Sequence, residues 1–488
     1  MKLGDLTDGQ TGDAAATRVT GCAIDHRKVA PGTVFGAFRG LARDGEDFID
    51  DAVAAGAVAV VARPEARVPA PAIHIADAEP RRAFARLAAR FFAPFPERVV
   101  AVTGTNGKTS TVELTRQLWR MQGLAAASIG TLGVTTTDAD GKAAQVSTGL
   151  TTPDIVTFLS NMAGLRMEGV THAAFEASSH GLSQFRTEGL PVRVAGFTNL
   201  SRDHLDYHGT MAAYLEAKLR LFTEVVDRDG TAVVWADDEA STRVIELARE
   251  RGLRLITVGT RGEALRLIDR RPTQLGQVLT IEADPALGGG VHKVNLPLIG
   301  AYQAANALVA AGFALATGGS LADVLGGMSR LQPVRGRLER AVITARGAPV
   351  YVDYAHTPDG LRAAIEALKP HAERLIVVFG AGGDRDTGKR PEMGAVAVEL
   401  ADVAIVTDDN PRSEDPASIR AAILAAAPGA REIGDRRAAI AAALAEAGEG
   451  DVVLVAGKGH EVGQIVGAGE TLRVLAFDDV AVARECAA

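Results

Sequence analysis

A glycine-rich turn, Gly104-Thr105-Asn106-Gly107-Lys108-Thr109, is the segment best suited to chemistry. It follows the β-rich run Val99–Val102 and precedes a helical pattern over Ser110–Met121. Glycines let backbone N–H groups approach phosphate oxygens, the helix N-terminus adds partial positive charge, and the lysine adds a full one. The next hydroxyl side chain could reach Mg²⁺. Only two residues separate the glycines, against four in the standard phosphate loop, so the turn predicts a variant ATP site, with a plain turn as the alternative.

Three more side chains in this region could hold a metal ion. Glu176 ends the apolar run His172–Phe175, and His204 follows the next expected strand. Lys218 lies on the apolar face of an expected helix, where loss of water would favour the neutral amine. Such an amine can capture CO₂ as a carbamate, which offers oxygens to a metal. The alternatives are a solvated glutamate, a structural histidine and a lysine that extends to solvent.

Four apolar runs in the last third of the chain each end in polar residues. They are Pro349–Val352 before DYAHTPD, Leu375–Phe379 before GAGGDRD, Val403–Val406 before TDDNPR and Val452–Val455 before AGKGHE. In open α/β sheets ligands bind beyond the carboxyl ends of the strands. The four loops therefore predict a second binding region.

Strand and helix patterns alternate along the chain, which predicts an α/β fold with mostly parallel sheets. Helices cannot continue through Ala93-Pro94-Phe95-Pro96, and the pattern changes again near Leu331-Gln332-Pro333. We predict an N-terminal domain over 1–95, a central phosphate-loop domain over 96–331, and a C-terminal Rossmann-like domain over 332–488.

The composition excludes several classes of protein. A net charge of −8 argues against nucleic-acid binding, which needs a basic surface. The longest apolar stretch, Ala52–Ala62, is far shorter than a membrane span, and the first residues lack the apolar core of a signal peptide. Cys22 and Cys486 are the only cysteines and show no zinc-ligand spacing. We expect a cytoplasmic enzyme, most simply a monomer.

The motifs together resemble a known family. The variant loop TGTNGKTS is similar to the ATP loop of the Mur ligase superfamily, which includes cell-wall ligases, folylpolyglutamate synthases and cyanophycin synthetases. TTPD, EASSHGL, NLSRDHLDYHG, DYAHTPD, GGDRDTGKR, DDNPR and GKGHE occur in the order seen in its UDP-N-acetylmuramoyl-tripeptide synthetases. The segment Asp25–Gly45 also resembles that family's uridine-nucleotide domain.

The resemblance implies roles for individual residues. ATP would be bound by the loop residues through Ser110, with Asn306 and Arg337; Glu339 lies in the same interdomain region. Metal ions would be held by Thr109, Glu176, His204 and carbamylated Lys218, and Lys108 would act in catalysis with the last three. The UDP-linked substrate would contact Asp25, His26, Arg27, Thr151, Thr152, Ser178, Gln184 and Arg186.

The amino-acid substrate is expected to be selected by DDNPR. Compared with L-lysine, meso-diaminopimelate carries a carboxylate beside its far ammonium, so recognition needs a cation and an anion held together. Arg412 and Arg385 suit the carboxylate, whereas Asp409 and Glu461 suit the ammonium. Within the family DNPR resembles the diaminopimelate signature, and the implied site is Arg385, Asp409, Asn410, Arg412, Gly457 and Glu461.

The resemblance implies an ATP-dependent amide ligase. The D-glutamate carboxylate of UDP-N-acetylmuramoyl-L-alanyl-D-glutamate would attack the γ-phosphate, and an amine of diaminopimelate would displace phosphate from the acyl phosphate. The alternatives are an L-lysine-adding sister ligase, a folate–glutamate ligase and, from another class, a phosphate-loop kinase or nucleotide-binding regulator.

Three positions depart from the family pattern. His26 stands where Ser is common, Trp235 where Asn is common and Gln303 where Asn is usual. Adenine could stack on Trp235, although the amide hydrogen bonds of the usual residue would be lost.

Overall fold

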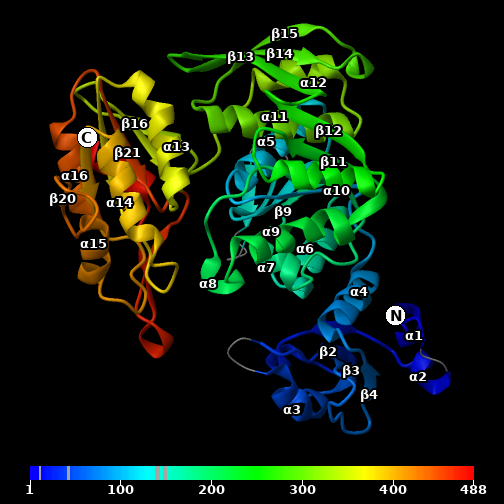
Figure 1. Ribbon diagram of the computed structural model, residues 1–488. Coiled ribbons are helices and arrows are strands. Elements are labelled where there is room, and N and C mark those ends of the chain that lie inside the picture. The colour runs from blue at the N-terminus through cyan, green and yellow to red at the C-terminus, as the bar shows by residue number, and fades with distance from the viewer. Residues whose placement is uncertain (10–11, 41–43, 138–142, 147–150, 488) are drawn as a thin grey trace.

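The computed structural model describes residues 1–9, 12–40, 44–137, 143–146 and 151–487. Its described strands form three main sheets in three successive parts of the chain, coloured blue, cyan to green, and yellow to red in Figure 1. The predicted α/β class with parallel sheets is confirmed. No described helix is long and apolar enough to cross a membrane.

The N-terminal unit is a four-stranded parallel sheet with the strands in sequential order. Its core contains Val34, Val60 and Phe84. Cis peptide bonds precede Pro71 and Pro94, and the second follows the last helix of the unit. The strands are β1 (Gly21–Ala23), β2 (Thr33–Gly36), β3 (Ala57–Ala62) and β4 (Ile73–Ala76), and the helices are α1 (Leu3–Leu6), α2 (Gly12–Ala16), α3 (Ile49–Ala54) and α4 (Pro80–Phe92).

The long helix α4 joins this unit to the central one (Figure 1). Proline occupies its first turn, where no backbone hydrogen bond is lost. On its outer face Arg82 and Arg86 both donate to Glu188 of the central unit, at 2.9 and 3.1 Å. The structure describes no residue of 41–43, which the sequence placed within the uridine-nucleotide segment.

The central unit is a mixed sheet in the order β15-β14-β13-β12-β11-β10-β5-β9-β6-β7-β8. Strands β12, β11, β10, β5, β9 and β6 are parallel neighbours, and β5 lies in the middle. Most buried residues of its parallel strands are small or β-branched, as expected for strands covered on both faces. The strands are β5 (Arg98–Thr103), β6 (Ala126–Gly130), β7 (Gly133–Thr137), β8 (Ala143–Val146), β9 (His172–Glu176), β10 (Val192–Phe197), β11 (Val226–Trp235), β12 (Arg254–Gly259), β13 (Leu265–Thr273), β14 (Gly276–Ala283) and β15 (Val291–Leu296).

Helices α5 and α11 pack together, α5 next to β5 and α11 next to β10, β11 and β12. Helix α5 begins at Lys108, two residues before the predicted start, because Gly107 adopts the left-handed conformation (φ 87°) that ends the loop. Antiparallel strands β13 to β15 extend one edge of the sheet, and the sequence did not predict them. The helices are α5 (Lys108–Met121), α6 (Ile155–Met167), α7 (Ser179–Ser183), α8 (Leu205–His208), α9 (Met211–Arg220), α10 (Ser241–Glu250), α11 (Ala301–Ala316) and α12 (Leu321–Met328).

The C-terminal unit is a six-stranded sheet in the order β16-β17-β21-β18-β19-β20, parallel except for β16. The four predicted strands, now β17, β18, β19 and β21, are adjacent in it. A separate antiparallel hairpin of β22 and β23 was not predicted. The strands are β16 (Glu339–Ile343), β17 (Pro349–Asp353), β18 (Arg374–Phe379), β19 (Val403–Val406), β20 (Arg431–Glu432), β21 (Asp451–Ala456), β22 (Gly463–Val466) and β23 (Arg473–Ala476), and the helices are α13 (Pro358–Leu368), α14 (Lys389–Leu400), α15 (Pro416–Leu424), α16 (Arg436–Glu446) and α17 (Asp479–Ala487).

The described sheets thus fall within the three predicted ranges. The boundaries at 95/96 and 331/332 themselves stay predictions.

Candidate active site

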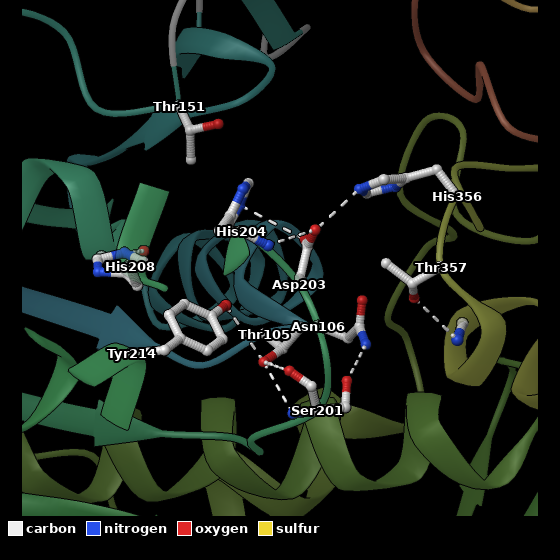
Figure 2. Close-up of polar contacts among 12 residues, drawn as sticks. Thr105, Asn106, Thr151, Ser201, Asp203, His204, His208, Tyr214, His356 and Thr357 are labelled. Carbon is white, nitrogen blue, oxygen red and sulfur yellow. Dashed lines mark hydrogen bonds and ion pairs between the residues drawn. The ribbon is translucent and has the colours of Figure 1, made fainter. Parts of the chain in front are cut away.

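A cavity of about 690 Å³ lies where the central and C-terminal units meet. The central unit contributes the glycine-rich loop, Glu176, His204 and Trp235, and the C-terminal unit contributes Arg337 and the loop after β17. Figure 2 shows part of this site, with His356 and Thr357 on the C-terminal side facing Asp203 and Asn106. Two units therefore share one site.

The loop between β5 and α5 has no room for side chains at its glycines. A Cβ atom on Gly104 would lie 1.9 Å from Oγ1 of Thr198, and one on Gly107 would lie 2.2 Å from Oδ1 of Asn306. The Nζ atom of Lys108 donates to the carbonyls of Gly104 and Thr105, at 2.9 and 2.8 Å. The loop thus keeps a cation and the first N–H groups of α5 together beside the cavity.

Glu176 at the end of β9 is almost fully buried in the cavity wall. Its Oε1 accepts from the N–H of Thr131 at 2.7 Å, and its Oε2 from the hydroxyl of the same residue at 3.1 Å. Burial raises the pKa of this carboxyl, against the opposing effect of Lys108. Thr109 also lies beside it and accepts a 3.0 Å hydrogen bond from Nη2 of Arg337, so a C-terminal residue reaches the phosphate loop.

Lys218 on α9 is buried, and no carboxylate of the described residues forms an ion pair with it. Its Nζ atom donates to the carbonyl of Gly104 at 2.7 Å and lies 4.1 Å from the ring centre of Tyr214. Burial, and then the charge of Lys108, lower the pKa of Lys218 well below its ordinary value. The tyrosine hydroxyl lies 3.3 Å from Oγ1 of Thr105, which connects this corner to the phosphate loop (Figure 2).

Asp203 lies between histidines of two units (Figure 2). Its Oδ2 lies 3.4 Å from Nε2 of His204 and 3.9 Å from Nε2 of His356, which belongs to the DYAHTPD loop. Although burial opposes the shift, His356, His204 and Lys389 lower the pKa of this carboxyl to about 2. Burial lowers the pKa of His204 to about 3 and that of His356 to about 4.

Part of the cavity lining is aromatic or aliphatic. Trp235, at the end of β11, lines the cavity together with Tyr302 and Val309. Asn306 on α11 lies next to Gln303, 3.5 Å between Nδ2 and Oε1, and Gln303 donates to the carbonyl of Arg337 at 3.1 Å. The Trp235 ring and the buried amide of Asn306 could therefore contact a nucleotide base.

Four of the eight residues expected to contact the UDP-linked substrate form one hydrogen-bonded group. Thr152 accepts from the N–H of Ser178 at 3.1 Å, and its carbonyl accepts from Nη1 of Arg186 at 2.7 Å. Arg186 also donates two hydrogen bonds to Oε1 of Gln184, from Nε at 3.1 Å and from Nη2 at 2.7 Å. Thr151 lies beside this group, with its hydroxyl 3.1 Å from that of Thr131 in the cavity wall.

The remaining three expected contacts, Asp25, His26 and Arg27, lie between β1 and β2 in the N-terminal unit. The guanidinium of Arg27 engages both oxygens of Asp25, at 2.9 and 2.7 Å. His26 stacks on the ring of Phe48, 4.4 Å between centroids. The structure therefore does not bring these residues into the phosphate-loop cavity.

The residues expected to bind the amino acid surround the tips of β19 and β21. Nδ2 of Asn410 donates to Oε2 of Glu461 at 2.8 Å, and Nη1 of Arg412 donates to the carbonyl of Gly383 at 2.7 Å. Asp409 is buried, and a Cβ atom on Gly457 would lie 2.5 Å from its Oδ2. Arg385 is exposed on the loop after β18.

Several residues of these sites were not assigned from the sequence. Lys458 is fully buried and donates to Oδ1 of Asn410 at 2.9 Å and to Oε2 of Glu461 at 3.1 Å. Arg202 pairs with Asp386 and Glu392 of the C-terminal unit, at 3.2 and 3.1 Å. The motifs that contain Lys458, Asp203 and His356 were recognised, but nothing in their spacing shows which partner each side chain meets.

The oxygen groups of the cavity suit a magnesium ion better than a metal held wholly by protein. Among the described residues no cluster of three or more His, Cys, Asp or Glu side chains could hold a metal. Mg²⁺, however, usually takes one or two carboxylates and completes its shell with water and phosphate oxygens. Glu176 and the Thr109 hydroxyl beside the phosphate loop meet that need.

Comparisons with known proteins agree with this arrangement. Three family models match successive parts of the chain: "Mur ligase family, catalytic domain" over 18–92, "Mur ligase middle domain" over 102–314, and "Mur ligase, glutamate ligase domain" over 336–459. The chain therefore belongs to the Mur ligase family, and the predicted ligase class is confirmed.

Curated relatives match over almost the full length. A protein of Zymomonas mobilis subsp. mobilis is 59% identical, over 96% of this chain and 94% of its own. One from Bradyrhizobium diazoefficiens is 52% identical, over 98% and 97%. Both are named UDP-N-acetylmuramoyl-L-alanyl-D-glutamate--2,6-diaminopimelate ligase.

Solved structures share the fold. A structure with the same ligase name covers 100% of this chain and 98% of its own, with a TM-score of 0.70 and 32% identity. A MurF ligase from Thermotoga maritima, solved in complex with ADP, has a TM-score of 0.62 at 20% identity, over 96% of this chain and 97% of its own.

Proposed function

We propose that the protein is an ATP-dependent ligase that adds meso-diaminopimelate to the D-glutamate of UDP-N-acetylmuramoyl-L-alanyl-D-glutamate. The observation that carries the proposal is the shared cavity, in which the phosphate loop and Glu176 meet Arg337 and His356 of the other unit. The names of relatives up to 59% identical support the substrates. The reaction belongs to the synthesis of peptidoglycan precursors and so to cell-wall biogenesis, cell shape and division.

ATP is proposed to bind along the loop from Gly104 to Ser110, with its base near Trp235. Asn306 and Arg337 complete this part of the site from α11 and the C-terminal unit. Lys108 can exchange its carbonyl acceptors for phosphate oxygens, because a lysine ammonium on a flexible stem rotates freely. Its charge then stabilises the transferred phosphoryl group.

The metal set is proposed to be Thr109, Glu176, His204 and a carbamate on Lys218. Bound Mg²⁺ would neutralise charge on the phosphates. A lysine cation is disfavoured at position 218 by burial and by Lys108, whereas a carbamate anion would be attracted by Lys108. The carbamate nitrogen keeps one hydrogen, which suffices for the bond to Gly104.

The muramoyl dipeptide is proposed to reach from Asp25, His26 and Arg27 to the group formed by Thr151, Thr152, Ser178, Gln184 and Arg186. That group adjoins Glu176, since the Thr152 hydroxyl donates to its backbone carbonyl at 2.8 Å. The D-glutamate carboxylate would thus meet the γ-phosphate beside the phosphate loop. Water must be kept away from the acyl phosphate, and the contact between the two units helps to exclude it.

Diaminopimelate is proposed to bind at Arg385, Asp409, Asn410, Arg412, Gly457 and Glu461. Arg412 can fork onto the far carboxylate, and Asp409 and Glu461 can accept from the neighbouring ammonium. L-Lysine lacks that carboxylate, so it would leave the guanidinium without its partner.

The test is ADP release measured with purified protein, the UDP-linked dipeptide and a panel of amines. We expect turnover that depends on both the dipeptide and meso-diaminopimelate. Equal turnover with L-lysine would exclude the diaminopimelate assignment, and turnover independent of any amine would favour the kinase alternative. We also propose that the protein is cytoplasmic and monomeric. Light scattering on the purified protein measures its mass and so tests the monomer.

A further inference from the structure

A second cavity, of about 510 Å³, lies apart from the catalytic one. It is bounded by helix α5, strand β7, and the connector from Gln332 to Arg335 that leads into the C-terminal unit. Its volume falls in the range of about 300–1,000 Å³ that small-molecule sites occupy. None of the residues assigned above to ATP, metal, UDP-linked substrate or amino acid lines it.

Two polar groups in its lining are buried without a hydrogen-bond partner among the described residues. They are Nη1 of Arg116 and Oγ1 of Thr135, on side chains that are only 4% and 5% exposed as residues. A buried donor without an acceptor is costly, and such a group calls for a ligand or an ordered solvent molecule. The guanidinium nitrogen can only donate and the hydroxyl can donate, so one oxygen acceptor, best a negatively charged one, could satisfy both.

The charged groups in the lining can also accommodate an anion. Arg116 and Arg335 are basic residues of the lining, and Glu113 is an acidic one. Both oxygens of Glu113 are engaged, Oε2 by Arg116 at 2.8 Å and Oε1 by the hydroxyl of Ser128. Arg335 pairs with Asp478 at 3.0 Å but keeps nearly half of its side chain exposed.

The cavity also adjoins two elements that lead to the active site. Helix α5 carries Lys108 at its other end, and its Gln117 exchanges two hydrogen bonds with the backbone of Gln332, at 3.2 and 2.8 Å. We propose that this cavity is a binding site for a small anion bearing a carboxylate or phosphate group, held by Arg116, Thr135 and Arg335. An occupant would contact both the phosphate-loop helix and the connector between the units.

Calorimetric titration tests the site directly. The probes are inorganic phosphate and succinate, added to protein whose catalytic site is filled with Mg²⁺ and a non-hydrolysable ATP analogue. Turnover is not needed, so failure of the ligase assignment would not affect the result. We expect at least one probe to bind, and the better one identifies the head group.

Three variants separate the site from general effects. Thr135→Val removes the unpartnered hydroxyl at nearly constant volume, and we expect about tenfold weaker binding, with a smaller loss for Arg335→Gln. Thr137→Val is the matched control, because its hydroxyl is also buried and unpartnered in β7 but does not line the cavity. Binding by neither probe, or equal binding by wild type, Thr135→Val and Arg335→Gln, would overturn the proposal.

Discussion

The two halves of the active site handle buried charge in opposite ways. In the central unit, Lys108 and Lys218 donate to backbone carbonyls, and burial lowers the pKa of both. In the C-terminal unit, two buried cations have carboxylate partners: Lys458 with Glu461, and Arg436 with Asp479 at 2.7 Å. Cations without a carboxylate partner can bind the negative charge of a polyphosphate. Cations already paired within the protein instead fix the shape of a pocket for an amino acid that is itself zwitterionic.

The largest effect should follow from removing a cation of the central half. We expect Lys108→Met to lower kcat by about 1,000-fold, because one preorganised charge at a developing phosphoryl group contributes about that much. Thermal stability should be unchanged or higher, since the variant loses a buried charge. ADP release and a melting curve measure both, and the exposed Lys293→Met is the control.

The next effect concerns the shape of the loop that carries this cation. In Gly107→Ala, the new Cβ atom would lie 2.2 Å from Oδ1 of Asn306 and the residue would keep a positive φ. We expect kcat/KM for ATP to fall by about 100-fold, because a misplacement of about 1 Å costs that much. Gly169→Ala is the matched control: its φ of +85° is nearly the same, but nothing lies within 4 Å. Equal losses in both variants would mean that strain alone, and not the contact with α11, matters.

In the C-terminal half, the sharpest change is Arg412→Lys. It keeps the charge but loses the planar fork, so KM for meso-diaminopimelate should rise about 10- to 100-fold while KM for ATP stays constant. Discrimination against L-lysine should fall by the same factor. Arg473→Lys, on the exposed hairpin strand β23, is the control. A parallel rise in the KM for ATP would show that the two halves are not independent.

The sequence predicted the strands and their polar tips because burial and turn chemistry are local. Thus the expected run Leu375–Phe379 became nearly all of β18, and the phosphate loop lies where its glycines indicated. Pairings over long distances were not predictable. Asp203 meets His356 across about 150 residues, and one of the two acceptors of Lys458, Asn410, lies in a different loop. Neither contact leaves a periodic pattern in the sequence. The antiparallel strands β13 to β15 depend on register with each other, which short apolar runs do not encode.

The smallest effect tests the histidines where the two halves meet. Burial lowers the pKa of His356 to about 4, below its ordinary value of 6.5. Between those values the unfolded chain binds the proton that the folded protein excludes, so stability is full above pH 6.5 and decreases as the pH falls toward 4. The His356 side chain is 37% exposed, so solvent screens part of this effect, and at pH 5 the group lowers the free energy of unfolding by about 1 kcal/mol.

His356→Asn should therefore lose less stability than wild type when the pH falls from 7.5 to 5.0, measured by urea unfolding followed through the transition of the C-terminal unit. His292→Asn, in strand β15 far from the cavity, controls for a general effect of the substitution. If His356→Asn and wild type lose the same stability, the proton is not excluded at this junction. In that case His356 would be protonated and would form an ion pair with Asp203. The difference between the two halves of the site would then concern only their lysines.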